Sequence, residues 1–128
     1  MIAVDTNVLV RVLVDDPGER LQVQVARECV SRADTVFVPQ VVQVETVWVL
    51  ESAYGVGRAR LDQVLGHLLG NEAFVLQGEA AFAAALQCFR EGAADFPDCL
   101  ILEESRAAGC PLATFDKQLA RSEGTVAL

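Results

Sequence analysis

The sequence predicts an α/β domain in which a parallel sheet is covered by helices on both faces. Along the chain, short apolar segments typical of buried strands alternate with longer segments typical of helices. Short apolar strands separated by helices favour this architecture over an antiparallel one. The 128 residues fit one domain over residues 1–128, and they contain no internal repeat, low-complexity tract or linker.

In the first half of the chain, residues 2–4 are expected to form a strand that ends at Asp5, and residues 6–14 a helix. Asp16 and Pro17 predict a new helix to about residue 32, since they combine a capping residue with a first-turn proline. Residues 35–38 form a second strand, stopped by Pro39. The valines of residues 40–54 also suit a strand, but fifteen residues without a breaker favour a helix.

In the second half, glycines and prolines mark most boundaries between the expected elements. Gly55 and Gly57 separate the preceding helix from the next one, and Gly70-Asn71 ends that helix. The expected helices cover residues 58–69, 79–91 and 97–108, and the expected strands cover residues 74–76, 111–114 and 125–127. The prediction is therefore a central parallel sheet of about five strands.

Composition excludes several classes of protein. With 52% apolar and 22% charged residues, the chain is not intrinsically disordered. Its longest apolar run, residues 80–86, is far shorter than the roughly 18 residues of a membrane span. No signal peptide is visible at the N-terminus, and the spacing of the four cysteines and of His67 indicates neither a disulfide framework nor a zinc site. We expect a cytoplasmic protein with reduced thiols.

The chain is acidic, with 10 Lys and Arg against 18 Asp and Glu and a net charge of −8. Such a balance usually counts against binding of nucleic acid, because phosphates are contacted by Lys and Arg. The net charge is misleading, however, if several carboxylates surround one metal ion. Nine arginines and one lysine remain available elsewhere for phosphate contacts.

Two acids follow predicted strands closely. Asp5 comes directly after the first strand, and Asp116 follows the fourth with only Phe115 between them. Ligands of open α/β sheets bind at the carboxyl ends of strands, so the two acids meet there if these strands are neighbours. The alternative is that each acid caps the helix that follows it.

Two further acids lie on helix faces that are expected to be apolar. Glu45 has valines at i−4 and i−3 and Trp48 and Val49 at i+3 and i+4, while Asp98 precedes Ile101 and Leu102 by three and four positions. A buried carboxylate is costly unless it is paired or binds a metal. A salt bridge to a buried arginine is the alternative for both, and a first-turn helix-dipole interaction is a further alternative for Asp98.

Taken together, the four acids indicate a metal site. Unpaired carboxylates that converge repel one another, so convergence implies a divalent cation. A site of oxygen ligands without His or Cys suits Mg²⁺ or Mn²⁺, and such a site typically hydrolyses phosphodiesters with metal-activated water. Asp95, in contrast, is expected to cap the helix at 97–108 by accepting from the N–H of Asp98, because Pro97 has none.

At these residues the sequence resembles the PIN-domain ribonucleases, specifically the VapC-type toxins of toxin–antitoxin pairs. The matching segments are DTNVLVR at residues 5–11, VETVWVL at 44–50, ADFPDCLI at 94–101 and TFDK at 114–117. Family members often carry a small residue where this chain has Pro97, which the first turn of a helix tolerates. With the order of elements, the resemblance covers essentially the whole chain.

The resemblance implies a three-layer α/β/α PIN-like fold and a Mg²⁺ or Mn²⁺ site formed by Asp5, Glu45, Asp98 and Asp116. Asp5 and Asp98 would be the main ligands, Glu45 would hold the metal or orient the attacking water, and Asp116 would act directly or through water. Expected contacts with the RNA substrate come from four further residues, Thr6, Asn7, Arg11 and Thr114. Arg11 would contact RNA phosphate or an antitoxin, although a solvated arginine is an equal alternative.

Family members cleave RNA, usually as homodimers, and a cognate VapB-type antitoxin silences them by lying across the active-site groove. Two alternative functions remain. One is a stand-alone PIN-domain nuclease that processes RNA. The other is a receiver-like phosphoacceptor module, but the third predicted strand ends in Leu76-Gln77 rather than Asp, and the only lysine directly follows Asp116.

Overall fold

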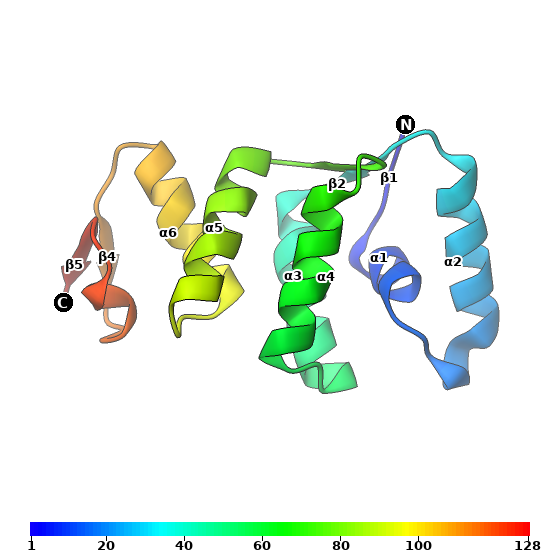
Figure 1. The fold of residues 1–128 in the computed structure, drawn as a ribbon, viewed down its shortest axis with the longest axis horizontal. Coiled ribbons are helices and arrows are strands. Elements are labelled where there is room, and N and C mark those ends of the chain that lie inside the picture. Colours follow the sequence, from blue (N-terminus) through cyan, green and yellow to red (C-terminus); the bar gives the residue numbers. More distant parts are fainter. The chain divides into compact units, whose positions relative to one another are not determined.

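A computed structural model describes all of residues 1–128, and Figure 1 labels its helices and strands. The chain divides into two compact units, Met1–Gln77 and Gly78–Leu128. Helices alternate with short strands, and every strand pair is parallel. The predicted α/β fold with parallel pairing is confirmed.

The N-terminal unit is built on a three-stranded sheet. Its strands are β1 (Ile2–Ala3), β2 (Val36–Val38) and β3 (Phe74–Leu76), in the order β1-β2-β3. Ile2 pairs with Val36, and Val36 pairs with Phe74 on the other side. The β-branched residues of β2 suit this central position, and Val36 and Val38 are fully buried.

Four α-helices complete this unit. They are α1 (Thr6–Leu13), α2 (Arg20–Arg32), α3 (Gln40–Tyr54) and α4 (Arg58–Gly70). Helix α1 packs against both α2 and α3. The helix predicted from Pro17 begins instead as a 3₁₀ turn, η1 (Pro17–Glu19), whose cap is Asp16 as predicted, because the Gly18 N–H donates to its side chain at 3.0 Å. Gly55 ends α3 in the left-handed conformation (φ 61°) that favours glycine.

The C-terminal unit consists of two helices and a two-stranded sheet. Its elements are α5 (Glu79–Glu91), α6 (Phe96–Ala107), β4 (Leu112–Thr114), the 3₁₀ helix η2 (Leu119–Arg121) and β5 (Thr125–Ala127). Helices α5 and α6 pack together, with the rings of Phe82 and Phe96 at a centroid distance of 5.0 Å. Both rings are fully buried, so they anchor the core of this unit.

The strand pairing differs from the prediction of one sheet with about five strands. The structure has two separate parallel sheets, β1-β2-β3 and β4-β5, so β1 and β4 are not neighbours in a sheet. Segments of two or three residues contain too little pattern to specify a partner, since strand register and order depend on the faces that tertiary packing buries. The sequence therefore predicts where the strands are better than what they pair with.

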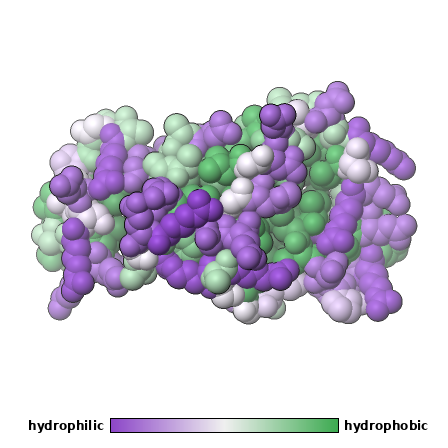
Figure 2. Space-filling view, viewed as in Figure 1, coloured by the Kyte–Doolittle hydropathy of each residue, from purple (hydrophilic) through white to green (hydrophobic).

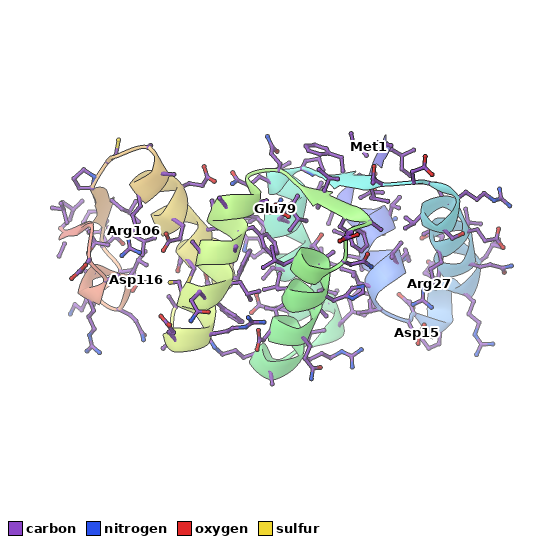
Figure 3. The ribbon with its side chains drawn as sticks, turned by 45° about the horizontal axis from the view of Figure 1, so that its top comes forward. Met1, Asp15, Arg27, Glu79, Arg106 and Asp116 are labelled. Carbon is purple, nitrogen blue, oxygen red and sulfur yellow. The ribbon has the colours of Figure 1, made fainter.

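The surface is mixed in polarity, as Figure 2 shows for one face of the molecule. Charged side chains pair locally on it: Arg27 of α2 meets Asp15 at 3.0 Å (Figure 3), and Arg106 meets Glu103 at 2.7 Å. Exposed ion pairs of this kind contribute little to stability. No helix is both long and apolar enough to span a membrane.

Candidate metal and nucleic-acid site

Asp5 is the N-cap of α1. Its Oδ1 atom accepts a hydrogen bond from the N–H of Val8 at 3.0 Å, and the residue is exposed. The capping alternative is thus observed for this acid. Capping engages one lone pair of one oxygen, whereas an ionised carboxylate has about four acceptor positions. Asp5 therefore retains acceptor positions for a second role at the start of α1.

Glu45 lies on α3 and reaches the start of α1. The Thr6 hydroxyl donates to its Oε1 atom at 3.2 Å, which joins two of the predicted site residues directly. The expectation that Glu45 sits on a buried stripe is wrong, since it is exposed together with Trp48. The face of α3 that is buried runs instead through Val42, Gln43, Thr46, Val47 and Leu50. Apolar residues surround α3 on every side, so spacing alone did not identify the buried face.

In the C-terminal unit, Asp95 caps α6 as predicted. Its Oδ1 atom accepts a hydrogen bond from the N–H of Asp98 at 2.8 Å. Pro97 has no N–H to offer at the preceding position, so the bond goes to Asp98. The cap determines where the first turn of α6 begins and holds the backbone of Asp98 in place.

Asp98 is the predicted ligand in the first turn of α6. Partial burial raises the pKa of its carboxyl above the ordinary value of 3.8, and the negative charges of Asp95 and Asp116 raise the pKa further. The effects of these charges indicate that the three carboxylates share one neighbourhood. The negative charges of Asp95 and Asp116 beside Asp98 favour the approach of a cation.

Asp116 follows β4 and precedes η2, whose N-cap position is Gln118. Its Oδ1 atom accepts from the N–H groups of Gln118 at 2.8 Å and Leu119 at 3.0 Å, so Asp116 stabilises the turn that leads into η2. Thr114, a predicted substrate contact, accepts from the N–H of Asp116 at 3.0 Å through its hydroxyl. Thr114 thereby shapes the turn that presents Asp116, which is exposed.

Arg11 is held by several partners. Its guanidinium forms an ion pair with Asp16 at 3.3 Å, donates to the Tyr54 hydroxyl and donates to Gln22 Oε1 at 3.0 Å. The Tyr54 hydroxyl in turn donates to Asp16 at 2.8 Å. The solvated arginine considered from the sequence is thus not what the structure has. Nothing in the sequence connects Arg11 with Tyr54, which is 43 positions away.

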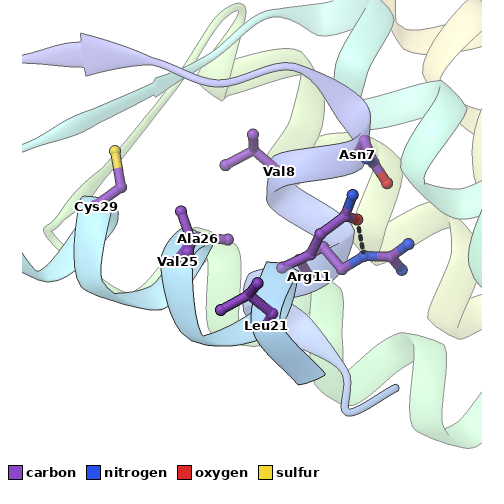
Figure 4. Close-up of a pocket in the computed structure, with 8 residues that line it drawn as sticks. Asn7, Val8, Arg11, Leu21, Val25, Ala26 and Cys29 are labelled. Atoms are coloured by element: carbon purple, nitrogen blue, oxygen red, sulfur yellow. Dashed lines mark hydrogen bonds between the residues drawn. The ribbon is translucent and has the colours of Figure 1, made fainter. Parts of the chain in front are cut away.

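The helices α1 and α2 form a mostly apolar cleft that the sequence did not predict (Figure 4). Its volume is about 420 Å³. Asn7, a predicted site residue, lies at this cleft, and Leu21 and Val25 are exposed along it at 73% and 58%. The remaining lining residues are Val8, Arg11, Gln22, Ala26 and Cys29. The sequence places Leu21 and Val25 one helical turn apart on α2, but it does not show that both are exposed.

The predicted quartet is divided between the units. Asp5 and Glu45 flank Thr6 in the N-terminal unit, and Asp98 and Asp116 are neighbours in the C-terminal unit. No three His, Cys, Asp or Glu side chains lie close enough together to hold a metal ion. Each unit thus presents two of the four acids: Asp5 follows β1 and Glu45 lies on α3, while Asp98 lies on α6 and Asp116 follows β4.

Comparison with protein families gives a match over most of the sequence. The model of the PIN domain family matches residues 2–124, which is nearly the whole chain. Neither curated proteins nor solved structures include a significant match.

Proposed function

The chain belongs to the PIN domain family, whose members are typically nucleases, and from this premise we propose that it is a Mg²⁺- or Mn²⁺-dependent endoribonuclease. The observation that carries the proposal is the environment of Asp98. Burial and two neighbouring acids raise its pKa, and no basic side chain is among the causes of the shift. A cation bound beside Asp98 would offset the repulsion between this carboxylate and those of Asp95 and Asp116.

The donor chemistry fits a hard divalent cation. We propose Asp5, Glu45, Asp98 and Asp116 as the residues that hold it, and all four offer oxygen, which Mg²⁺ and Mn²⁺ prefer. The bound ion would supply activation of water for attack on a phosphodiester.

The chain's own residues would position the metal site and the RNA. The Thr6 hydroxyl donates to Glu45 at 3.2 Å and so orients its carboxylate. In this orientation Glu45 would either accept a proton from the attacking water or bind the metal ion. Thr6 and Asn7 begin α1, where backbone N–H groups attract phosphate. Thr114 would assist by shaping the Asp116 turn. Arg11 would contact phosphate only by exchanging a bond to Asp16 or Tyr54.

The experiment compares cleavage of a single-stranded RNA with that of a DNA of the same sequence, in Mg²⁺, in Mn²⁺ and in EDTA. We expect internal cuts in RNA that need the metal. Glu45→Gln is expected to abolish cleavage, and Glu72→Gln, the same change at an exposed residue of the same unit, is expected to leave it unchanged. Cleavage that persists in EDTA, or equal loss in both variants, would contradict the proposal.

Metal binding has a separate readout that does not depend on RNA. Mn²⁺ is expected to raise the melting temperature of the protein, because an ion that binds only the folded state stabilises it. In Asp98→Asn this increase should be lost. An equal increase in both proteins would mean that the ion binds elsewhere.

We further propose that the nuclease is the toxin of a VapBC-type pair, acting as a homodimer in the cytoplasm. The support is the apolar cleft between α1 and α2, since exposed apolar patches mark protein partners. Leu21→Glu is expected to weaken inhibition by a small protein encoded next to this chain, while leaving RNA cleavage intact. If no neighbouring product inhibits the nuclease, the stand-alone RNA-processing alternative holds. Light scattering measures whether it is a dimer.

A further inference from the structure

Two cysteines of the C-terminal unit meet across a helix pair. Cys88 of α5 and Cys99 of α6 have their sulfur atoms 2.8 Å apart, and the two helices pack along each other. No disulfide is formed between them. A disulfide bond is about 2.05 Å long, so the two sulfurs need to move less than an ångström closer to be joined.

The two thiols differ in access. Cys99 is completely buried, whereas Cys88 is half-buried and lines a cleft of about 500 Å³ with Gly92, Arg106 and Glu123. A small oxidant in this cleft reaches the sulfur of Cys88 first. The sulfur of Cys99 then lies behind it, where a second thiol is needed to resolve a mixed disulfide.

We propose that Cys88 and Cys99 are a redox modification site that forms an intramolecular disulfide with a small disulfide oxidant such as oxidised glutathione. The Cys88 thiolate attacks one sulfur of the oxidant, the oxidant's S–S bond breaks, and one glutathione thiol leaves. The Cys99 thiolate attacks the Cys88 sulfur and expels the second glutathione. Two electrons pass from the cysteines to the oxidant, and the two protons end on the released glutathione thiols.

The bond would tie the first turn of α6 to α5. Cys99 directly follows Asp98, and the N–H of Asp98 is already held by the Asp95 cap. The modification goes beyond the proposed nuclease function and does not depend on it. The remaining cysteines, Cys29 and Cys110, are exposed and have no thiol partner within the chain.

The test uses the full chain with Cys29→Ser and Cys110→Ser, so that only the pair remains. The protein is incubated with oxidised glutathione, quenched in acid and analysed for thiols and intact mass. We expect both thiols to be lost, the mass to fall by two hydrogen atoms, and dithiothreitol to restore both. Trypsin cuts after Arg90 and Arg106, so the peptides 61–90 and 91–106 should be linked.

Two single substitutions in this background separate the roles of the thiols. Cys99→Ala should stop at a stable glutathione adduct on Cys88, whereas Cys88→Ser should leave Cys99 unmodified in the folded protein. Retention of both thiols in the parent chain would overturn the proposal. A persistent glutathione adduct in the parent, or covalent dimers in place of the internal link, would overturn it as well. The linked peptides test the proposal even if Cys99→Ala does not fold.

Discussion

Asp16 in the N-terminal unit and Asp98 in the C-terminal unit are the same residue type in opposite situations. The Tyr54 hydroxyl donates to Asp16 and, with the Gly18 N–H and the Arg11 charge, lowers the pKa of Asp16 below its ordinary value. Burial raises the pKa of Asp98, and Asp95 and Asp116 add to that effect. The carboxylate of Asp16 is surrounded by hydrogen-bond donors. The carboxylate of Asp98 is partly buried and lies near two other carboxylates.

On the proposed function, the difference separates acids that stabilise the fold from acids that would bind a ligand. The charge of Asp16 is compensated within the chain by Arg11 and by the Tyr54 hydroxyl. The ionised form of Asp16 therefore stabilises the folded state. The ionised form of Asp98 costs folding free energy, and on the proposed function a bound cation would offset that cost. Acids with a perturbed pKa tend to mark functional sites. A residue's partners, rather than its type, thus indicate which role it has.

The largest expected effect is on cleavage. Asp98→Asn should lower the rate of RNA cleavage by more than about 100-fold. Even substitution of residues that only hydrogen-bond to metal ligands lowers metal affinity or activity about 10- to 100-fold. Asp16→Asn keeps a side chain that accepts hydrogen bonds and should retain most of the activity. Initial rates in saturating Mn²⁺ measure both. If Asp16→Asn were as inactive as Asp98→Asn while folded, the division of roles would fail.

The next effect is on stability. Arg11→Ala removes an ion pair and leaves Asp16 and Tyr54 without their shared donor, at a cost of about 2 kcal/mol of unfolding free energy. Urea denaturation followed by circular dichroism measures it. A variant as stable as the parent would mean that Arg11 is available for RNA, and its effect on RNA affinity would then be the informative measurement.

A smaller effect, on stability, distinguishes the role of Asp95 from that of Asp98. Asp95→Ala should cost about 1 kcal/mol, the usual scale for a lost helix cap, and keep measurable cleavage. Asp98→Ala should reduce activity far more than stability. Thermal melts with parallel cleavage assays compare the pair. An Asp95→Ala protein that is inactive yet thermally unchanged would place both acids in the metal site.

The smallest effect is pH-dependent. Because the pKa of Asp98 is raised on folding, its ionisation destabilises the protein as pH rises through the ordinary value of 3.8 and the raised one. In EDTA at neutral pH, Asp98→Asn should therefore be more stable than the parent by about 0.5 kcal/mol, a screened value for a partly exposed group. The gain should vanish in acid. Asp16 acts in the opposite sense, since its stabilisation is present above its ordinary pKa and is lost as pH falls through the lowered one.

Local features were the most predictable from sequence, because their causes lie within a few residues. The Asp95 cap follows from a proline two positions later, and the extent of α3 follows from the lack of a breaker. The exposure of Glu45 and the separate pairing of β4 with β5 depend on packing between distant segments. The hydrogen bond from Arg11 to Tyr54 and the contact between the Cys88 and Cys99 thiols are likewise tertiary. No rule of sequence spacing predicts either of them.

The positions of the three strands of the N-terminal sheet along the chain have a consequence for folding during translation. All three of its strands lie within the first 76 residues, so a chain still attached to the ribosome has every strand of this sheet once they emerge. Domains generally fold as units during translation, from the N-terminus onward. At that stage Asp98 and Asp116 have not yet been added. On the proposed function, a nascent chain beside ribosomal RNA holds only half of its ligands, and the nuclease becomes competent only after Asp116 has emerged.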